Sequence, residues 1–166
     1  MISSNSHLDW TSDLREKLTL FGHRNWVVVA DAAYPAQSNP GIETVVVGGD
    51  HIKVVRTVLD AIAAKDHIRA NVYSDLELDF VLENDAPGVS QYRNGLKSMM
   101  GDTVVKRLEH EQIIAKLDHC AQLFKILIFK TDLTIPYSSV FFELDCGYWS
   151  ADAEERLWQA IQANEP

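Results

Sequence analysis

The sequence has few cysteines and few basic residues, and each shortage argues against a class of protein. Only two cysteines, Cys120 and Cys146, occur in 166 residues, and neither belongs to a C-x-x-C pair. We therefore expect two buried free thiols, with a bridge between them as the less favoured alternative. Lys and Arg number 15 against 24 Asp and Glu, a net charge of −9. This balance argues against a nucleic-acid partner, because phosphate binding needs clustered cations.

Long apolar runs are also missing. The longest, Leu123 to Phe129, contains Lys125 and is far too short to cross a bilayer. The first seven residues, MISSNSH, are polar and lack the basic-then-apolar order of a signal peptide. The sequence thus predicts a cytoplasmic protein without a membrane partner.

Several motifs of cofactor and catalytic sites do not occur. There is no G-x-G-x-x-G, no Walker loop, no G-x-S-x-G and no H-E-x-x-H. Gly48-Gly49 precedes an expected helix, but Asp50 would repel a phosphate there, which favours a simple tight turn. His110, His119 and Cys120 do not fall neatly on one helical face and lack a supporting carboxylate pattern, so we expect no metal site.

Helical and strand patterns alternate along the whole chain. The expected helices are 11–21, 51–65, 91–100, 111–122 and 151–163, with Asp50 and Ser150 as caps of the second and the last. The expected strands are 26–30, 44–47, 71–73, 76–80, 104–108, 123–129 and 140–144. This order predicts a single α/β domain, residues 1–166, with three α/β/α layers around a mostly parallel sheet; a mixed sheet is the alternative.

The segment 20–38, LFGHRNWVVVADAAYPAQS, organises the candidate site. Gly22 ends a helix, His23 follows at the corner, and the apolar run 26–30 has the composition of a buried strand. Asp31 then stands at the carboxyl end of that strand, where ligands of open α/β sheets bind. His23 is also the natural proton carrier at neutral pH.

Two other polar positions lie beside strand ends or loops, His110 and Tyr137. Taken singly, each candidate has a commoner structural interpretation. His23 is commonly a helix cap or a partly buried structural histidine, and His110 a helix cap. Asp31 is commonly a strand-end residue that binds backbone N–H groups, and Tyr137 a residue that packs at a loop corner. Spacing along the sequence does not show that they converge.

Four segments resemble the D-ribose pyranase and L-fucose mutarotase family. Segment 22–38 is similar to its N-terminal signature, in which Gly-His, a short apolar strand, Asp-Ala and Pro-Ala-x-Ser follow one another. Tyr-Arg-Asn-Gly-Leu at 92–96 resembles a segment of the fucose enzymes, and His-Glu-Gln at 110–112 resembles one of the ribose enzymes. Segment 124–137 resembles the strand, turn and tyrosine that end family members.

The resemblance implies a monosaccharide mutarotase or pyranase that interconverts anomers by general acid–base catalysis without a cofactor. L-Fucose or a similar sugar is favoured, with D-ribose as the other candidate. It implies His23 as the main acid/base and Tyr137 as its partner across the sugar. Asp31, His110 and Ser139 would bind the substrate. It also implies a ring-like homo-oligomer, often a decamer.

The chain departs from the family pattern at Ala33 and at Ser139, where the family has asparagine. These departures favour, as the alternative, a non-catalytic monosaccharide-binding or sensing oligomer with the same fold. A purely structural oligomer is a third hypothesis. The tail, about 145–166, lies beyond the usual end of the family and is expected to be a helical extension.

Overall fold

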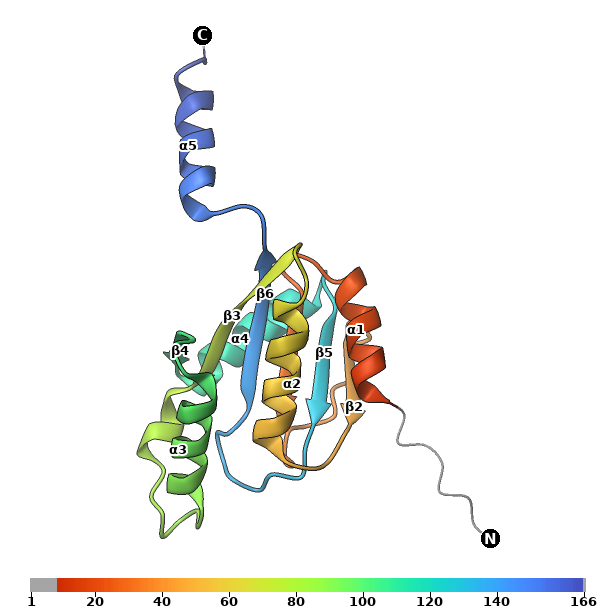
Figure 1. Ribbon diagram of the computed structural model, residues 1–166, viewed down its shortest axis with the longest axis vertical. Helices are drawn as coiled ribbons and strands as arrows, with labels where there is room; N and C mark the ends of the chain where they lie inside the picture. Colours follow the sequence, from red (N-terminus) through yellow and green to blue (C-terminus); the bar gives the residue numbers. More distant parts are fainter. Residues whose placement is uncertain (1–8, 166) are drawn as a thin grey trace, which may run out of the picture.

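A six-stranded mixed sheet runs through the centre of the molecule (Figure 1). The computed structural model describes residues 9–165, so the polar segment 1–7 that argued against a signal peptide lies outside the described residues. The strands are β1 (Trp26–Ala30), β2 (Ile42–Val46), β3 (Ile68–Asp75), β4 (Val105–Leu108), β5 (Ile126–Lys130) and β6 (Val140–Cys146). Their order across the sheet is β2-β5-β1-β6-β3-β4.

Strand β6 is antiparallel to both of its neighbours, β1 and β3. The other pairs, β1 with β5, β2 with β5 and β3 with β4, are parallel. Because two antiparallel steps restore the direction, β1 and β3 run the same way and end at the same edge of the sheet. That edge carries the candidate site.

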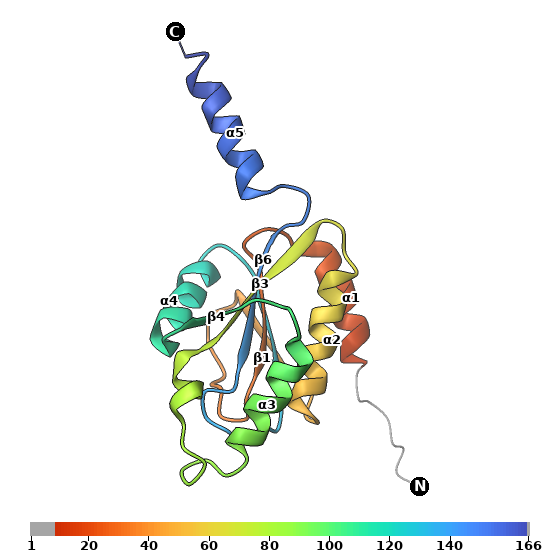
Figure 2. The ribbon, with the colours of Figure 1, turned by 60° about the vertical axis from the view of Figure 1, so that its left-hand side comes forward.

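Helices cover both faces of the sheet, which confirms the three-layer α/β prediction (Figure 2). Helices α1 (Trp10–Leu20), α2 (His51–Ala63) and α3 (Val89–Met100) lie on one face, and α4 (His110–Ala121) lies on the other. A hydrophobic core lies on each face of the sheet, and adjacent residues of β6 point into different cores. Phe142 packs in the core under α1, α2 and α3, and Phe141 packs in the core under α4.

Helix ends follow the local sequence signals. The Asp50 side chain accepts a hydrogen bond from the Lys53 backbone N–H at 3.1 Å, which caps α2 as predicted. Ser150 caps the last helix, α5 (Ala151–Gln162), through a 3.0 Å bond from the Ala153 N–H. The two cysteines are free thiols; Cys120 is buried, whereas Cys146 is only partly so.

The predicted strand 76–80 is wrong. Leu76–Phe80 forms a 3₁₀ helix, η1, in which only Leu78 is buried. The Arg93 guanidinium, rather than a neighbouring strand, donates to the Leu78 carbonyl of η1 at 2.9 Å and to the Val81 carbonyl just after it at 2.8 Å. An apolar–acidic alternation over five residues fits one turn of 3₁₀ helix as well as a strand.

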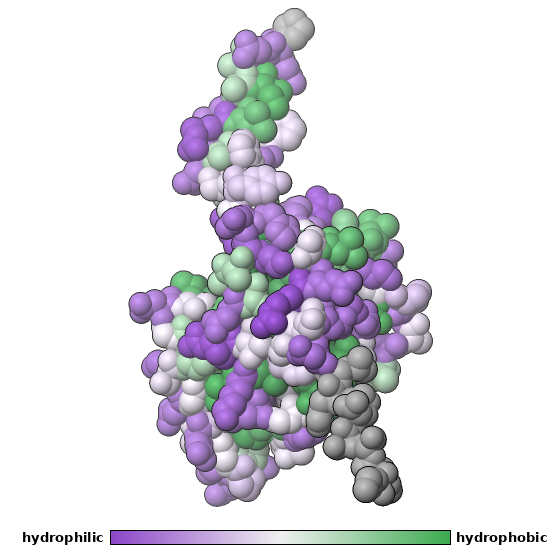
Figure 3. Space-filling model, turned by 45° about the vertical axis from the view of Figure 1, so that its right-hand side comes forward, coloured by the Kyte–Doolittle hydropathy of each residue, from purple (hydrophilic) through white to green (hydrophobic). Residues whose placement is uncertain are grey.

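Helix α5 stands away from the rest of the chain (Figures 1 and 2). None of its residues, all of which are described, is buried, and Leu157, Trp158 and Ile161 are exposed. Figure 3 shows apolar side chains gathered on one side of this projecting helix. Its apolar side is therefore not packed on the core of its own chain. Among residues 9–165, no helix combines the length and apolarity needed to cross a membrane.

Candidate functional site

A cavity of about 380 Å³ opens where the carboxyl ends of β1 and β3 meet the start of α4. The loop between β5 and β6 closes its remaining side, because β6 starts at this same edge. The cavity is lined by carboxyl, imidazole and phenol groups together with small apolar residues: Asp31, Ala33, Tyr34, Pro35, Gln37, Asp75, His110, Glu111, Ile114, Pro136 and Tyr137. Three of the five predicted site residues, Asp31, His110 and Tyr137, thus lie together.

Hydrogen bonds hold the Asp31 carboxylate at the end of β1. One oxygen accepts the Ala33 backbone N–H at 2.9 Å, and the other accepts the Ser139 hydroxyl at 2.9 Å. The Ser139 oxygen also accepts the Asp31 backbone N–H at 3.1 Å. Ser139 is buried and commits these contacts to Asp31, so it supports the site from behind rather than lining the cavity.

His110 is the first residue of α4 and is fixed on three sides. Its backbone N–H, one of the free donors at a helix start, faces the two Glu77 carboxylate oxygens at 3.0 Å each. Its Nδ1 lies 3.1 Å from Oδ2 of Asp75. Its ring meets the Tyr137 ring edge-on, with centroids 5.6 Å apart and an interplanar angle of 76°. Tyr137 has a positive φ of 57°, which places it in the left-handed region.

Two groups of the cavity were missed from the sequence, Asp75 and Tyr34. Asp75 is 1% exposed, and burial raises the pKa of its carboxyl to about 6, with the nearby His110 opposing the rise. Burial likewise raises the pKa of the Tyr34 hydroxyl. Asp75 ends β3 as Asp31 ends β1, but the expected strand 76–80 concealed that end. A strand boundary at Asp75 is the signal that could have found it.

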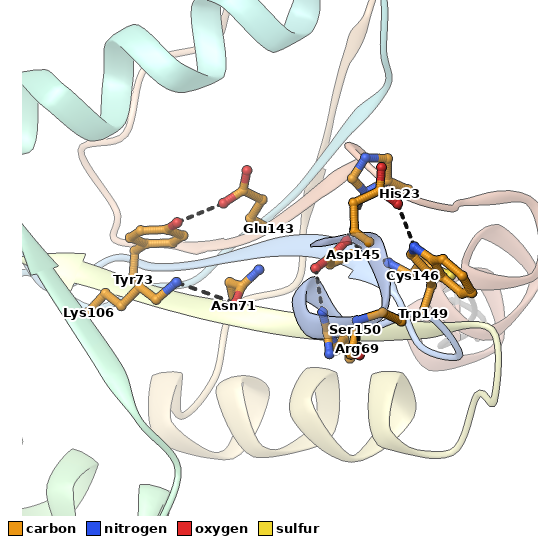
Figure 4. Close-up of polar contacts among 12 residues, drawn as sticks. His23, Arg69, Asn71, Tyr73, Lys106, Glu143, Asp145, Cys146, Trp149 and Ser150 are labelled. Atoms are coloured by element: carbon orange, nitrogen blue, oxygen red, sulfur yellow. Dashed lines mark hydrogen bonds and ion pairs between the residues drawn. The ribbon is translucent and has the colours of Figure 1, made fainter. Parts of the chain in front are cut away.

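His23 lies away from this cavity. It precedes β1 whereas Asp31 follows it, and β1, at about 3.3 Å per residue, places roughly 13 Å between its own ends. His23 Nδ1 is 2.9 Å from Oδ1 of Asp145, whose Oδ2 is 2.9 Å from Arg69 (Figure 4). These residues line a separate cavity of about 560 Å³ with Trp149, at the base of α5. One chain therefore does not bring His23 to Tyr137.

No group of three or more His, Cys, Asp and Glu side chains in segment 9–165 is arranged to hold a metal ion. His110 pairs with Asp75, while Cys120 donates its thiol to the Arg24 carbonyl at 3.0 Å.

The raised pKa of Asp75 predicts a pH-dependent stability difference. In the unfolded chain this carboxyl ionises near its ordinary pKa of 3.8, whereas in the folded protein it stays protonated up to about 6. The folded state therefore loses stability relative to the unfolded state as pH rises between these values. Asp75→Asn removes that loss. The melting temperature of the variant minus that of the unmodified protein should therefore rise from pH 4 to 6 and stay constant above pH 6.

Thermal unfolding in steps of half a pH unit measures this difference. Asp102→Asn removes an exposed carboxylate and serves as the control, for which the difference should stay flat. A difference for Asp75→Asn that is constant across the window, or that falls with pH, would contradict the expectation.

Comparison with known proteins gives one family and several solved structures of one fold. A sequence model of the RbsD / FucU transport protein family matches residues 10–146. α5 lies beyond the matched segment. No curated protein is similar enough to the chain to match it.

Solved structures with the same fold include sugar complexes. RbsD of Bacillus subtilis, complexed with D-ribose, superposes with a TM-score of 0.56 at 16% identity, over 87% of this chain and 98% of that one. The fucose mutarotase of Streptococcus pneumoniae, in complex with L-fucose, has a TM-score of 0.52 at 19% identity, over 85% and 98%. FucU from Bifidobacterium longum has a TM-score of 0.53 at 16% identity, over 81% and 94%. At these identities the likeness is one of fold.

Proposed function

Because the chain belongs to the RbsD / FucU transport protein family, as the sequence resemblance predicted, we propose that it is a monosaccharide mutarotase or pyranase. The observation that supports this most is the meeting of Asp31, His110 and Tyr137 in one cavity. Carboxylate and imidazole groups bind sugar hydroxyls, and a phenol can donate a hydrogen bond to a ring oxygen or accept one from a hydroxyl. Two proteins of this fold hold D-ribose and L-fucose, which supports a monosaccharide as the ligand. Among these sugars, L-fucose or a similar deoxyhexose stays our preferred substrate.

The reaction needs two proton transfers. One group takes the proton of the anomeric hydroxyl while another protonates the ring oxygen, and the bond between C1 and the ring oxygen breaks. Rotation and reclosure of the open aldehyde then give the other anomer. Acid–base groups positioned in this way supply about 10² to 10⁴-fold, and the steps call for no cofactor.

His23 and Tyr137 are the proposed acid/base groups, and they can act together only across two copies of the chain. The length of β1 keeps His23 away from the cavity of the same copy. The imidazole that reaches each cavity would therefore have to be His23 of a neighbouring copy. We therefore propose a homo-oligomer with shared sites, ring-like as the resemblance implies; a decamer and a cytoplasmic location stay predictions. Asp31 and His110 would bind hydroxyls, with Ser139 holding Asp31 in place.

A non-catalytic sugar-binding protein is the second candidate. The single chain holds the hydroxyl-binding groups in its cavity but keeps His23 outside it. A protein whose copies do not bring His23 to that cavity would bind a sugar without opening its ring.

Exchange spectroscopy separates these functions. The full-length protein is added to D-ribose and to L-fucose, and NMR saturation is transferred between the anomer signals and from protein to sugar. Faster anomer exchange with at least one sugar is the expected result. Binding without faster exchange would favour the sensor, and the absence of both would contradict the proposed function.

A further inference from the structure

Asp75 has one oxygen in use and one that lacks a partner. Its Oδ2 faces His110 Nδ1 at 3.1 Å, whereas Oδ1 is buried with no hydrogen-bond partner among residues 9–165. The residue lines the candidate cavity but is almost fully hidden from solvent. A ligand in the cavity would thus meet His110, whose side chain is 31% exposed, rather than the Asp75 carboxyl itself.

This contact decides which nitrogen of His110 is free. Above about pH 6 the Asp75 carboxylate is ionised and only accepts hydrogen bonds, so Nδ1 of His110 carries the proton that points to Asp75. In the neutral ring, Nε2 then has its lone pair available to the cavity. Tyr137 packs edge-on against the same ring, and the Glu77 contact fixes the backbone behind it. Both the orientation and the tautomer of the imidazole are therefore set by its surroundings.

Burial disfavours the charged form of Asp75, and no hydrogen bond to its Oδ1 offsets that cost. An apolar residue at the end of β3 would avoid both penalties. Groups that are unfavourable for folding persist where they serve function. Asp75 lies beside His110, the one imidazole among the described residues that line the cavity, and a functional role of Asp75 would therefore act on that ring.

We propose that Asp75 is a positioning residue that makes His110 a proton-accepting group of the site, beyond the binding of hydroxyls. This inference rests on the proposed sugar chemistry. The anomeric O–H bond breaks and its proton moves to His110 Nε2, which forms an N–H bond. The C1–ring-oxygen bond breaks at the same time, and the ring oxygen takes a proton from the acid across the sugar, His23 of the neighbouring copy. Asp75 balances the charge of the imidazolium until reclosure returns both protons.

Other ionisable groups face this pair and must be separated from it. Asp31 arrives from β1, Glu77 from η1, Glu111 from α4 and Tyr34 from the loop after β1. Each stays in place when Asp75 alone is changed to Asn, so a change in the pH profile that is confined to this variant reports on Asp75.

The first measurement is made without sugar on the unmodified full-length protein. ¹⁵N NMR of the histidine rings, recorded with the imidazole neutral, should show His110 with its proton on Nδ1. A predominant Nε2–H tautomer would overturn the inference, and this reading does not depend on the stability of any variant.

The second measurement compares Asp75→Asn with Asp102→Asn and the unmodified protein. In Asp75→Asn, kcat for anomer exchange should fall by about 10²-fold, with a much smaller change in KM. The pH profile of kcat should also change in this variant, because the Asp75 carboxyl, whose pKa burial raises to about 6, no longer titrates beside His110. Asp102→Asn should match the unmodified protein. An Asp75→Asn protein with unchanged kcat and pH profile would overturn the inference, whereas an unmodified protein that exchanges no anomers would overturn the proposed function itself.

Discussion

His23→Ala should lower anomer exchange by about 10² to 10⁴-fold while the protein stays folded and assembled. The imidazole lies in an exposed turn, and its main partner is Asp145, itself held by Arg69. Loss of an exposed ion pair changes stability by no more than about 1 kcal/mol. Stability and activity therefore separate the two interpretations of His23. A residue that only caps the turn would lower the melting temperature and leave the rate per molecule unchanged.

The shared site gives this prediction a sharper form. His23→Ala and Tyr137→Phe should each be inactive alone, because each lacks one of the two groups, His23 and Tyr137, that the proposed shared site takes from different copies of the chain. When the two proteins are dissociated, mixed in equal amounts and reassembled, about a quarter of the sites would combine an intact His23 from one copy with an intact Tyr137 from the next.

Recovery of exchange in the mixture would show that the site spans two copies. His119→Ala, which removes an exposed histidine outside the cavity, serves as the control and should stay active throughout. Light scattering should give a mass well above the 18.7 kDa of one chain. A stable monomer that exchanges anomers at full rate would contradict the shared site, and a fully active His23→Ala protein would remove His23 from the mechanism.

Phe142→Ala should destabilise the fold by about 3 to 5 kcal/mol. Phe142 is fully buried on β6 and packs in the core under α1, α2 and α3, so its loss leaves a large cavity between central strand and helices. Such a loss is a large fraction of the stability of a typical domain. Urea unfolding followed by circular dichroism measures it.

The chain offers the same substitution at an exposed position. Phe80 ends η1 and is 75% exposed, so Phe80→Ala should stay within about 0.5 kcal/mol of the unmodified protein. Equal losses at the two positions would contradict the account of the core, and would indicate that Phe80 is covered by another copy.

Local signals predicted most of the elements. The apolar run 26–30 is β1, Asp50 and Ser150 cap their helices, and Asp31 lies at the predicted strand end. Each of these depends on a few neighbouring residues. Seven residues, 24–30, lie between His23 and Asp31 and include the strand, but the sequence did not show which edge of the sheet carries the cavity.

Long-range pairing could not be predicted in the same way. The antiparallel pairing of β6 with β1 joins residues more than a hundred positions apart, such as Val28 and Phe141, and no local pattern encodes it. To predict Asp75 as a site residue, one must place the end of β3 at Asp75, and the apolar–acidic alternation of residues 76–80 conceals that end. The contact between the Asp75 carboxyl and the His110 imidazole also joins residues 35 positions apart. Those contacts, rather than the helices, make the candidate site.

The position of β6 has a consequence for how the chain is made. β1, β5 and β2 form one half of the sheet and β3 with β4 the other, and β6 is the strand that joins them. On the ribosome β6 emerges last of the six strands, so until then each half exposes an unpaired apolar edge where its partner belongs. Such edges invite pairing with other chains. Nascent chains stalled before Val140 should thus depend on chaperones, and the sheet should close only as the end of translation approaches.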